Sequence, residues 1–267
     1  MKTTIEKITP EAASKMLAAC NTRNRPLKAH HVAWLAGQMR AGHWMKNGDT
    51  ITFAKDGTLI DGQHRLSAVA LSQVTIECII VRDADEDAFA TKDTGMPRSS
   101  SDVLALAGER HYCLLASTVK LLLRYNYSAK NGGRLVGSLR CTNRDVMAFV
   151  ESNQSVRESV SFAASLSTPP GFMTPTIPAV VHYLGSAVDQ QKTEEFLGLV
   201  VSGIGLSAGD PVLVLRNRLM ANKGSVAKVS RDLVLALTAK AWHLHIAGKK
   251  ASCLKYAEDE ASFPWIK

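Results

Sequence analysis

The run Leu59-Ile60-Asp61-Gly62-Gln63-His64-Arg65-Leu66 stands where a short, β-branched apolar segment gives way to a helical pattern. We expect Asp61 to cap that helix through its carboxylate, and Gly62 to let the backbone approach a ligand closely. Gln63, His64 and Arg65 then fall in the first helical turn, where backbone N–H groups and the positive end of the helix dipole attract anions. An imidazole and a guanidinium on that turn add charge-assisted donors that suit phosphate. The run therefore predicts a binding site for the phosphate of a nucleotide or a nucleic acid.

A plainer interpretation of the same residues stays open. Asp-Gly is also a common turn, so Asp61 can be a helix cap and nothing more. His64 and Arg65 are then solvated residues of the first turn, because a junction of strand, glycine and helix is not rare.

The residues around this run predict a small α/β module. Residues 50–54 alternate like a strand, Asp56-Gly57 is a hairpin turn signal, and residues 58–60 return as the partner strand. Thr9 and Pro10 are typical of a helix start, so we expect a helix over 9–20. Apolar spacing predicts further helices over 28–42 and 62–72, and a strand over 74–81. A helix through Phe89 and a capped helix from about Ser101 complete this part.

From Glu109 onward the strand signals vanish. Helices are expected over residues 109–127, after a cap at Thr142, over 154–166, over 176–188, over 191–204, from 211, and over 229–247. We therefore predict an α+β fold, in which an α/β module over residues 1–108 precedes an all-helical domain over 109–267.

The charge of the chain is concentrated in its second part. The net charge is +8; residues 1–108 hold 13 Lys and Arg against 12 Asp and Glu, whereas residues 109–267 hold 19 against 12. A basic domain favours a polyanion such as DNA as its partner, although a basic soluble domain is the alternative. Residues 142–165 are the best candidate for a helix-turn-helix. The residues expected to contact DNA are Arg140, Arg144, Arg216, Arg218 and Lys223.

Other features exclude several classes of protein. The five cysteines form no C-x-x-C pair, which argues against a zinc ribbon or a disulfide framework. No apolar run has the length of a membrane span, and the first residues lack the apolar core of a signal peptide, so we expect a cytoplasmic protein with no membrane partner. His30 and His31 point apart on a helix, which argues against a metal site there.

Asp61-Gly62-Gln63-His64-Arg65 resembles the signature of the ParB/sulfiredoxin-like superfamily, in the DGQHR form carried by relatives of the DNA phosphorothioation regulator DndB. ParB partition proteins have Gly-Glu-Arg-Arg at the matching place, and sulfiredoxins have Gly-Cys-His-Arg. The resemblance covers roughly residues 28–108. It implies that the motif opens a helix and holds the phosphates of a nucleotide such as CTP or ATP through Gly62, Gln63, His64 and Arg65.

The run Asp93-Thr94-Gly95, followed by Arg98, also resembles phage and prophage relatives of the DGQHR proteins. In the implied fold this loop lies near the phosphates, where Thr94, Gly95 and Arg98 would contact them. Asp61 and Asp93 are then expected to hold Mg²⁺ on a nucleoside triphosphate, because hard cations prefer carboxylate oxygens.

The residue at position 63 limits the chemistry. Sulfiredoxins need a cysteine there and ParB proteins use a glutamate, whereas Gln63 is only a weak base that can orient water. Sulfinic acid repair is therefore not expected, and any hydrolysis involving Asp61, Gln63 and His64 would be slow.

Three hypotheses follow. The first is a phage- or plasmid-type, DNA-associated protein that binds a nucleotide or DNA phosphate. The second is a metal-dependent nuclease in which His64 is the general acid or base and Asp61 and Asp93 hold the metal. The third is a non-catalytic phage protein that counteracts a host defence. Assembly as a homodimer also stays open.

Overall fold

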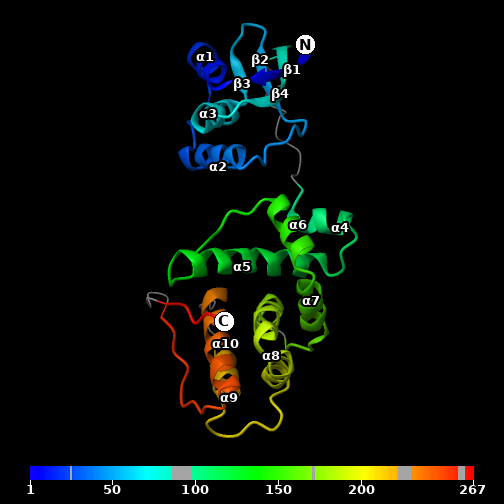
Figure 1. Cartoon of the computed structure of the whole chain (residues 1–267), viewed down its shortest axis with the longest axis vertical. Helices are drawn as coiled ribbons and strands as arrows, with labels where there is room; N and C mark the ends of the chain where they lie inside the picture. Colours follow the sequence, from blue (N-terminus) through cyan, green and yellow to red (C-terminus); the bar gives the residue numbers. More distant parts are fainter. Residues whose placement is uncertain (25, 86–97, 170–171, 222–229, 258–261) are drawn as a thin grey trace. The chain divides into compact units, whose positions relative to one another are not determined.

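The computed structural model describes the whole chain except residues 25, 86–97, 170–171, 222–229 and 258–261. The fold is α+β, and it divides into two compact units, Met1–Met96 and Pro97–Lys267, which we call the sheet unit and the helical unit (Figure 1). The division falls earlier than the expected boundary at residue 108. The reason is that α4 (Ser100–Leu106) packs on α5 (Tyr112–Asn131) and α6 (Asn143–Ser152), so it belongs with the helices.

The sheet unit contains one four-stranded mixed sheet. Its strands are β1 (Lys2–Ile8), β2 (Thr50–Ala54), β3 (Leu59–Asp61) and β4 (Ile76–Ala84), in the order β1-β4-β2-β3. β2 and β3 form the expected antiparallel hairpin, with Gly57 at a φ of 87° in the turn. β2 lies parallel to β4, and the crossover between them carries the DGQHR run into α3 (Gln63–Ser72).

β1 was not expected from the sequence. It pairs antiparallel with β4 along its whole length, from Lys2 opposite Arg82 to Ile8 opposite Ile76. Only Ile8 at its end is buried, because β1 is an edge strand whose other side chains face solvent. Such a strand lacks the apolar alternation by which buried strands are recognised.

Three helices complete the sheet unit. α1 (Pro10–Cys20) begins at Thr9, whose hydroxyl accepts the N–H of Ala12 at 3.2 Å, so the predicted cap is confirmed. α1 and α2 (Ala29–Arg40) both pack against α3. The core between helices and sheet is made of aliphatic side chains from all layers, among them Met39, Ile51, Leu66, Val69 and Ile80.

The helical unit also contains α7 (Ser155–Ser165), α8 (Thr176–Ser202), α9 (Pro211–Ala221) and α10 (Arg231–Ile246). Thr142 caps α6 in a reciprocal capping box with Asp145, as predicted. α8 is broken at Asp189, where φ is −157° and ψ is 100°, and this break corresponds to the two separate helices expected there. Trp242 and Phe196 are the largest fully buried side chains of this unit.

The irregular tail after α10 is packed rather than loose. Phe263 and Ile266 are buried, and the N–H of Ile266 donates to the hydroxyl of Tyr125 at 2.6 Å. Within the part of the chain that the structure describes, no helix combines the length and the apolar character needed to cross a membrane.

Candidate phosphate-binding site

Gly62 connects β3 to α3 and is the N-cap residue of α3. Its φ is 103°, and an added Cβ would lie 2.9 Å from Ile51 Cγ1 and 3.1 Å from Ile51 Cα. Both the left-handed backbone and the contact with β2 require glycine. The fold therefore accounts for this glycine without any ligand.

The expectation that Asp61 caps α3 is wrong. The N-cap position belongs to Gly62, and no side chain caps the helix there. Asp61 is instead the last residue of β3, opposite Thr52, and its carboxylate lies 3.7 Å from the guanidinium of Arg65. Strand pairing holds Asp61 in the sheet, so its carboxylate is directed to the arginine four residues later.

Arg65 connects the helix to the sheet. Its Nη1 donates to the carbonyl of Thr50 in β2, and its side chain is only 19% exposed. Burial raises the pKa of the nearby Cys78 thiol to about 11, and the positive charge of Arg65 opposes part of that rise. Arg65 thus contacts Thr50 and Asp61 of its own unit, and its guanidinium places a positive charge near the start of α3.

Gln63 and His64 differ in exposure. Gln63 is 5% exposed and lies in the interior, whereas His64 is half-buried. The Nε2 of His64 accepts the backbone N–H of Lys28 at 3.2 Å, and its ring centroid lies 5.3 Å from that of His31. An imidazole that accepts at Nε2 is neutral and carries its proton on Nδ1. In this arrangement Nε2 is not available to take a proton from a substrate.

α2 and α3 run parallel to each other. Their N-terminal ends are joined by the contact from Lys28 to His64. Their C-terminal ends are joined by Arg40, which donates to the carbonyl of Leu71 at 3.3 Å, and by a contact of 3.7 Å between Ser72 Oγ and Met39 Sδ. Neither helix has a side-chain cap or an acidic residue in its first turn. Two positive helix ends therefore lie together at the DGQHR run.

The linker between α1 and α2 lies beside this junction. Asn24 Nδ2 donates to the carbonyl of Leu59 at 2.6 Å and to Asn21 Oδ1 at 2.7 Å. Hydrogen bonds from Thr58 lower the pKa of Asp56, and the charge of Arg23 contributes a smaller lowering, so Arg23 approaches the hairpin. The linker thus brings Lys28 to the start of α3, while Arg23 lies toward the hairpin turn that precedes β3.

Of the predicted loop residues, the structure describes only Arg98. Asp93, Thr94 and Gly95 fall outside the described residues, so the expected pairing of Asp61 with Asp93 around Mg²⁺ stays a prediction. Arg98 belongs to the helical unit, where its carbonyl accepts from Asn143 Nδ2 at 2.9 Å. Among the described residues, no three acidic, histidine or cysteine side chains are grouped as a metal site would need.

The arginines expected to contact DNA have different surroundings. Arg140 and Arg144 are exposed on either side of Thr142, at the start of α6. Arg216 is structural: its guanidinium donates to the carbonyls of Val200 and Val201 and lies 5.4 Å from the centre of the Phe172 ring. Arg218 is exposed on α9, and Lys223 lies outside the described residues.

The helix pair over 142–165 does not present a basic surface on its second helix. The exposed side chains of α7 are Ser155, Glu158, Ser161, Ala164 and Ser165. Its single arginine, Arg157, forms an ion pair with Glu109, with Nε 2.9 Å from Oε2. A recognition helix that contacts DNA phosphates and base edges needs donors on that face, so α7 is a poor candidate for one.

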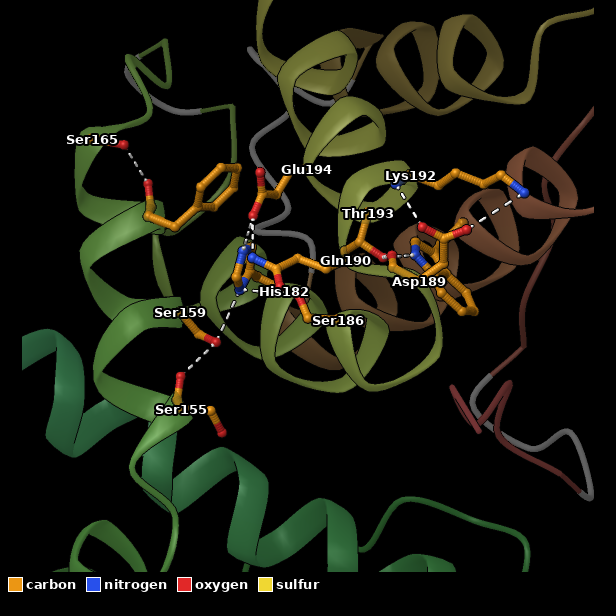
Figure 2. A network of polar contacts seen from close by, with 12 residues as sticks. Ser155, Ser159, Ser165, His182, Ser186, Asp189, Gln190, Lys192, Thr193 and Glu194 are labelled. Atoms are coloured by element: carbon orange, nitrogen blue, oxygen red, sulfur yellow. Dashed lines mark hydrogen bonds and ion pairs between the residues drawn. The ribbon is translucent and has the colours of Figure 1, made fainter.

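A buried polar network in the helical unit was not expected from the sequence (Figure 2). His182 of α8 is 4% exposed, and its Nδ1 lies 3.0 Å from Ser159 Oγ of α7. Its Nε2 lies 3.5 Å from Glu194 Oε1, across the break in α8, and its ring stacks on Phe162. The set resembles a nucleophile, base and acid, but Ser159 is 2% exposed and donates to Ser155 O. The network is therefore closed to a substrate.

The buried histidine predicts a stability that depends on pH. Burial lowers the pKa of His182 below its ordinary value of 6.5, and Glu194 opposes only part of that effect. As pH falls below 6.5 the unfolded chain takes up a proton before the folded protein does, so the folded state loses stability. We expect His182→Asn, which keeps a polar group near the Nδ1 position, to flatten this decline. Urea unfolding between about pH 7 and pH 5 measures it.

His111→Asn is the matched control, because His111 is exposed and asparagine tolerates its φ of 51°. That variant should keep the acid-side decline of the wild type. An equal decline in His182→Asn would show that this histidine does not carry the effect.

The junction of α2 and α3 is chemically suited to hold an anion. It combines two helix dipoles with the cationic side chains of Lys28 and Arg65, and the imidazole of His64 lies between the two helices. Comparison of the chain with protein-family models, curated proteins and solved structures found no match.

Proposed function

We propose that this chain is a phage- or plasmid-type, DNA-associated protein that binds a nucleoside triphosphate of the CTP or ATP class, or a nucleic-acid phosphate. The site is the shared N-terminal end of α2 and α3. The observation that supports it is the parallel packing of two helices that lack both side-chain caps and acidic first turns. The resemblance of the DGQHR run to phosphate-binding relatives adds the ligand class.

The same geometry favours binding over turnover. Gln63 is buried and the Nε2 of His64 accepts the N–H of Lys28, so neither residue is placed as a strong general base. Asp61 would supply one carboxylate oxygen to a Mg²⁺ ion on the triphosphate. Hydrolysis at such a site would be slow, as in a switch.

Duplex DNA is the partner that we propose for the helical unit. Residues 132–142, which we call the return segment, run back along α5: Val136 N donates to Ser128 Oγ at 3.1 Å, and Arg124 donates to Gly137 O at 2.8 Å (Figure 1). Exposed cations occur on α5, on the return segment and on α6, namely Lys120, Lys130, Arg134, Arg140 and Arg144. Cations spread along neighbouring segments are suited to contact successive phosphates of a nucleic acid.

The nucleotide site is tested by calorimetry with CTP, ATP and GTP, each with and without Mg²⁺. Lys28→Glu reverses a charge at the junction, and an acidic N-cap is compatible with the start of α2. We expect it to weaken nucleotide binding by about tenfold, which corresponds to about 1.4 kcal/mol. Lys15→Glu on α1 is the matched control, because Lys15 is exposed and the change in net charge is the same.

Equal affinities for the wild type and Lys28→Glu, or no nucleotide binding by either, would overturn nucleotide binding at the proposed site. The same titrations with duplex DNA at low and high salt address the second partner. Affinity should fall steeply with salt if the exposed cations contact phosphates, whereas a flat response would exclude that mode of binding.

A further inference from the structure

The helical unit contains a cavity whose lining includes Arg218, one of the arginines expected to contact DNA. Its volume is about 500 Å³, and residues of α9, α10 and the tail segment over residues 252–256 line it. This volume is within the range of pockets that hold small organic ligands.

The lining of the cavity has an apolar part and a cationic part. The buried side chains of Leu237 and Leu254 form its apolar floor, and the partly exposed Val214 and Leu233 extend it. Arg218 and Lys255 are the charged residues of the lining, and both are exposed. Among the described residues that line it there is no aspartate or glutamate. An apolar body with an anionic end complements such a surface.

The tail segment forms one wall of the cavity, and contacts at Ala251, Leu254 and Lys255 hold it in place. Ala251 N donates to Gly209 O at 2.8 Å, and Leu254 is buried in the core. Lys240 of α10 donates to the carbonyl of Lys255 at 2.6 Å, and its ammonium lies 5.3 Å from the centre of the Tyr256 ring. The cavity is therefore formed before any ligand arrives, which lowers the entropic cost of binding.

We propose that this cavity binds a small amphipathic carboxylate. Its aliphatic chain packs on Leu237 and Leu254, and its carboxylate lies at Arg218 and Lys255. The guanidinium provides paired donors for a carboxylate, and transfer of the chain from water to the leucine floor supplies the driving force. This site lies in the helical unit and is independent of the phosphate site proposed for the sheet unit.

The exposed thiol of Cys253 in the lining provides a direct readout, and the exposed Cys113 at the start of α5 provides an internal control. The full chain is alkylated with N-ethylmaleimide, and both cysteines are followed by peptide mass spectrometry. Decanoate, kept below its micellar concentration, is the probe. At about ten times its Kd it should slow alkylation of Cys253 about tenfold and leave the rate at Cys113 unchanged.

Three variants and one analogue decide the outcome. Arg218→Glu should remove the protection of Cys253, whereas Arg110→Glu, which reverses the charge of an exposed arginine outside the lining, should keep it. Decylamine, with the opposite charge on the same chain, should give no protection. Calorimetry on Cys253→Ser should still detect decanoate binding, because the thiol is only the reporter. Unchanged alkylation of Cys253 in decanoate, equal protection of Cys113, equal protection by decylamine, or full protection in Arg218→Glu would each overturn the proposal.

Discussion

Gly62→Ala is expected to destabilise the sheet unit by about 3 kcal/mol, the sum of left-handed backbone strain and an overpacked contact. The Cβ would meet the backbone of Ile51 as well as its side chain, so a change of rotamer does not relieve the overlap. Amide hydrogen exchange in β2 and α3 measures the free energy of opening within this unit.

Gly57→Ala is the control for that result. Gly57 also has a positive φ, of 87°, but an added Cβ there meets nothing within 4 Å. It should lose only about 1 kcal/mol through strain. If Gly62→Ala lost no more stability than Gly57→Ala, packing against Ile51 would not explain the glycine. Close approach of a ligand to the backbone would then be the better explanation. If the difference is as expected, variants of Gly62 report on folding and cannot test phosphate binding.

The second large effect is expected at the ion pair between Arg124 of α5 and Asp232 at the start of α10. The side chain of Arg124 is 8% exposed and donates through both terminal nitrogens to the carboxylate of Asp232. Asp232→Leu leaves a buried guanidinium without its counter-ion and should cost about 3 kcal/mol or more. Urea unfolding followed by the emission of Trp242 and Trp265, which both lie in this unit, measures the loss.

Arg124→Leu should cost less, because the carboxylate that it leaves behind is 28% exposed and can be solvated. The double variant Arg124→Leu, Asp232→Leu should be more stable than Asp232→Leu alone, since no charge then remains unpaired in the interior. A double variant whose loss equals the sum of the two single losses would show that the two side chains do not act as a pair.

The features that were predicted correctly from the sequence depend on contacts between residues that are only a few positions apart in the chain. Thr9 and Thr142 cap helices through contacts three residues away, and Asp56-Gly57 closes a hairpin within one turn. β1 depends on β4, which lies more than sixty residues later in the sequence. Its polar, exposed residues carry no local sign of that pairing. The position of Asp61 was predicted incorrectly for a related reason, because its place in β3 is set by pairing with Thr52.

Arginine is the residue whose contacts within the protein were least predictable from sequence. Arg65 and Arg216 were both expected to contact phosphates, and the structure adds that each donates to main-chain carbonyls of its own unit. In each case the carbonyl is about fifteen residues away along the chain and belongs to another element. The sequence next to either arginine gives no indication of such a partner. The parallel packing of α2 and α3, which defines the candidate site, is likewise a tertiary arrangement that neither helix reveals by itself.

The alignment of α2 with α3 also links the stability of the sheet unit to its solvent. Two helix dipoles that point the same way repel each other, and Arg40 relieves this only at the C-terminal ends. The proposed anion site between the N-terminal ends exists only while both helices are folded, so an anion bound there would shift the unfolding equilibrium toward the folded state by mass action. The melting temperature of the sheet unit would then depend on the anions of the buffer as well as on the polypeptide.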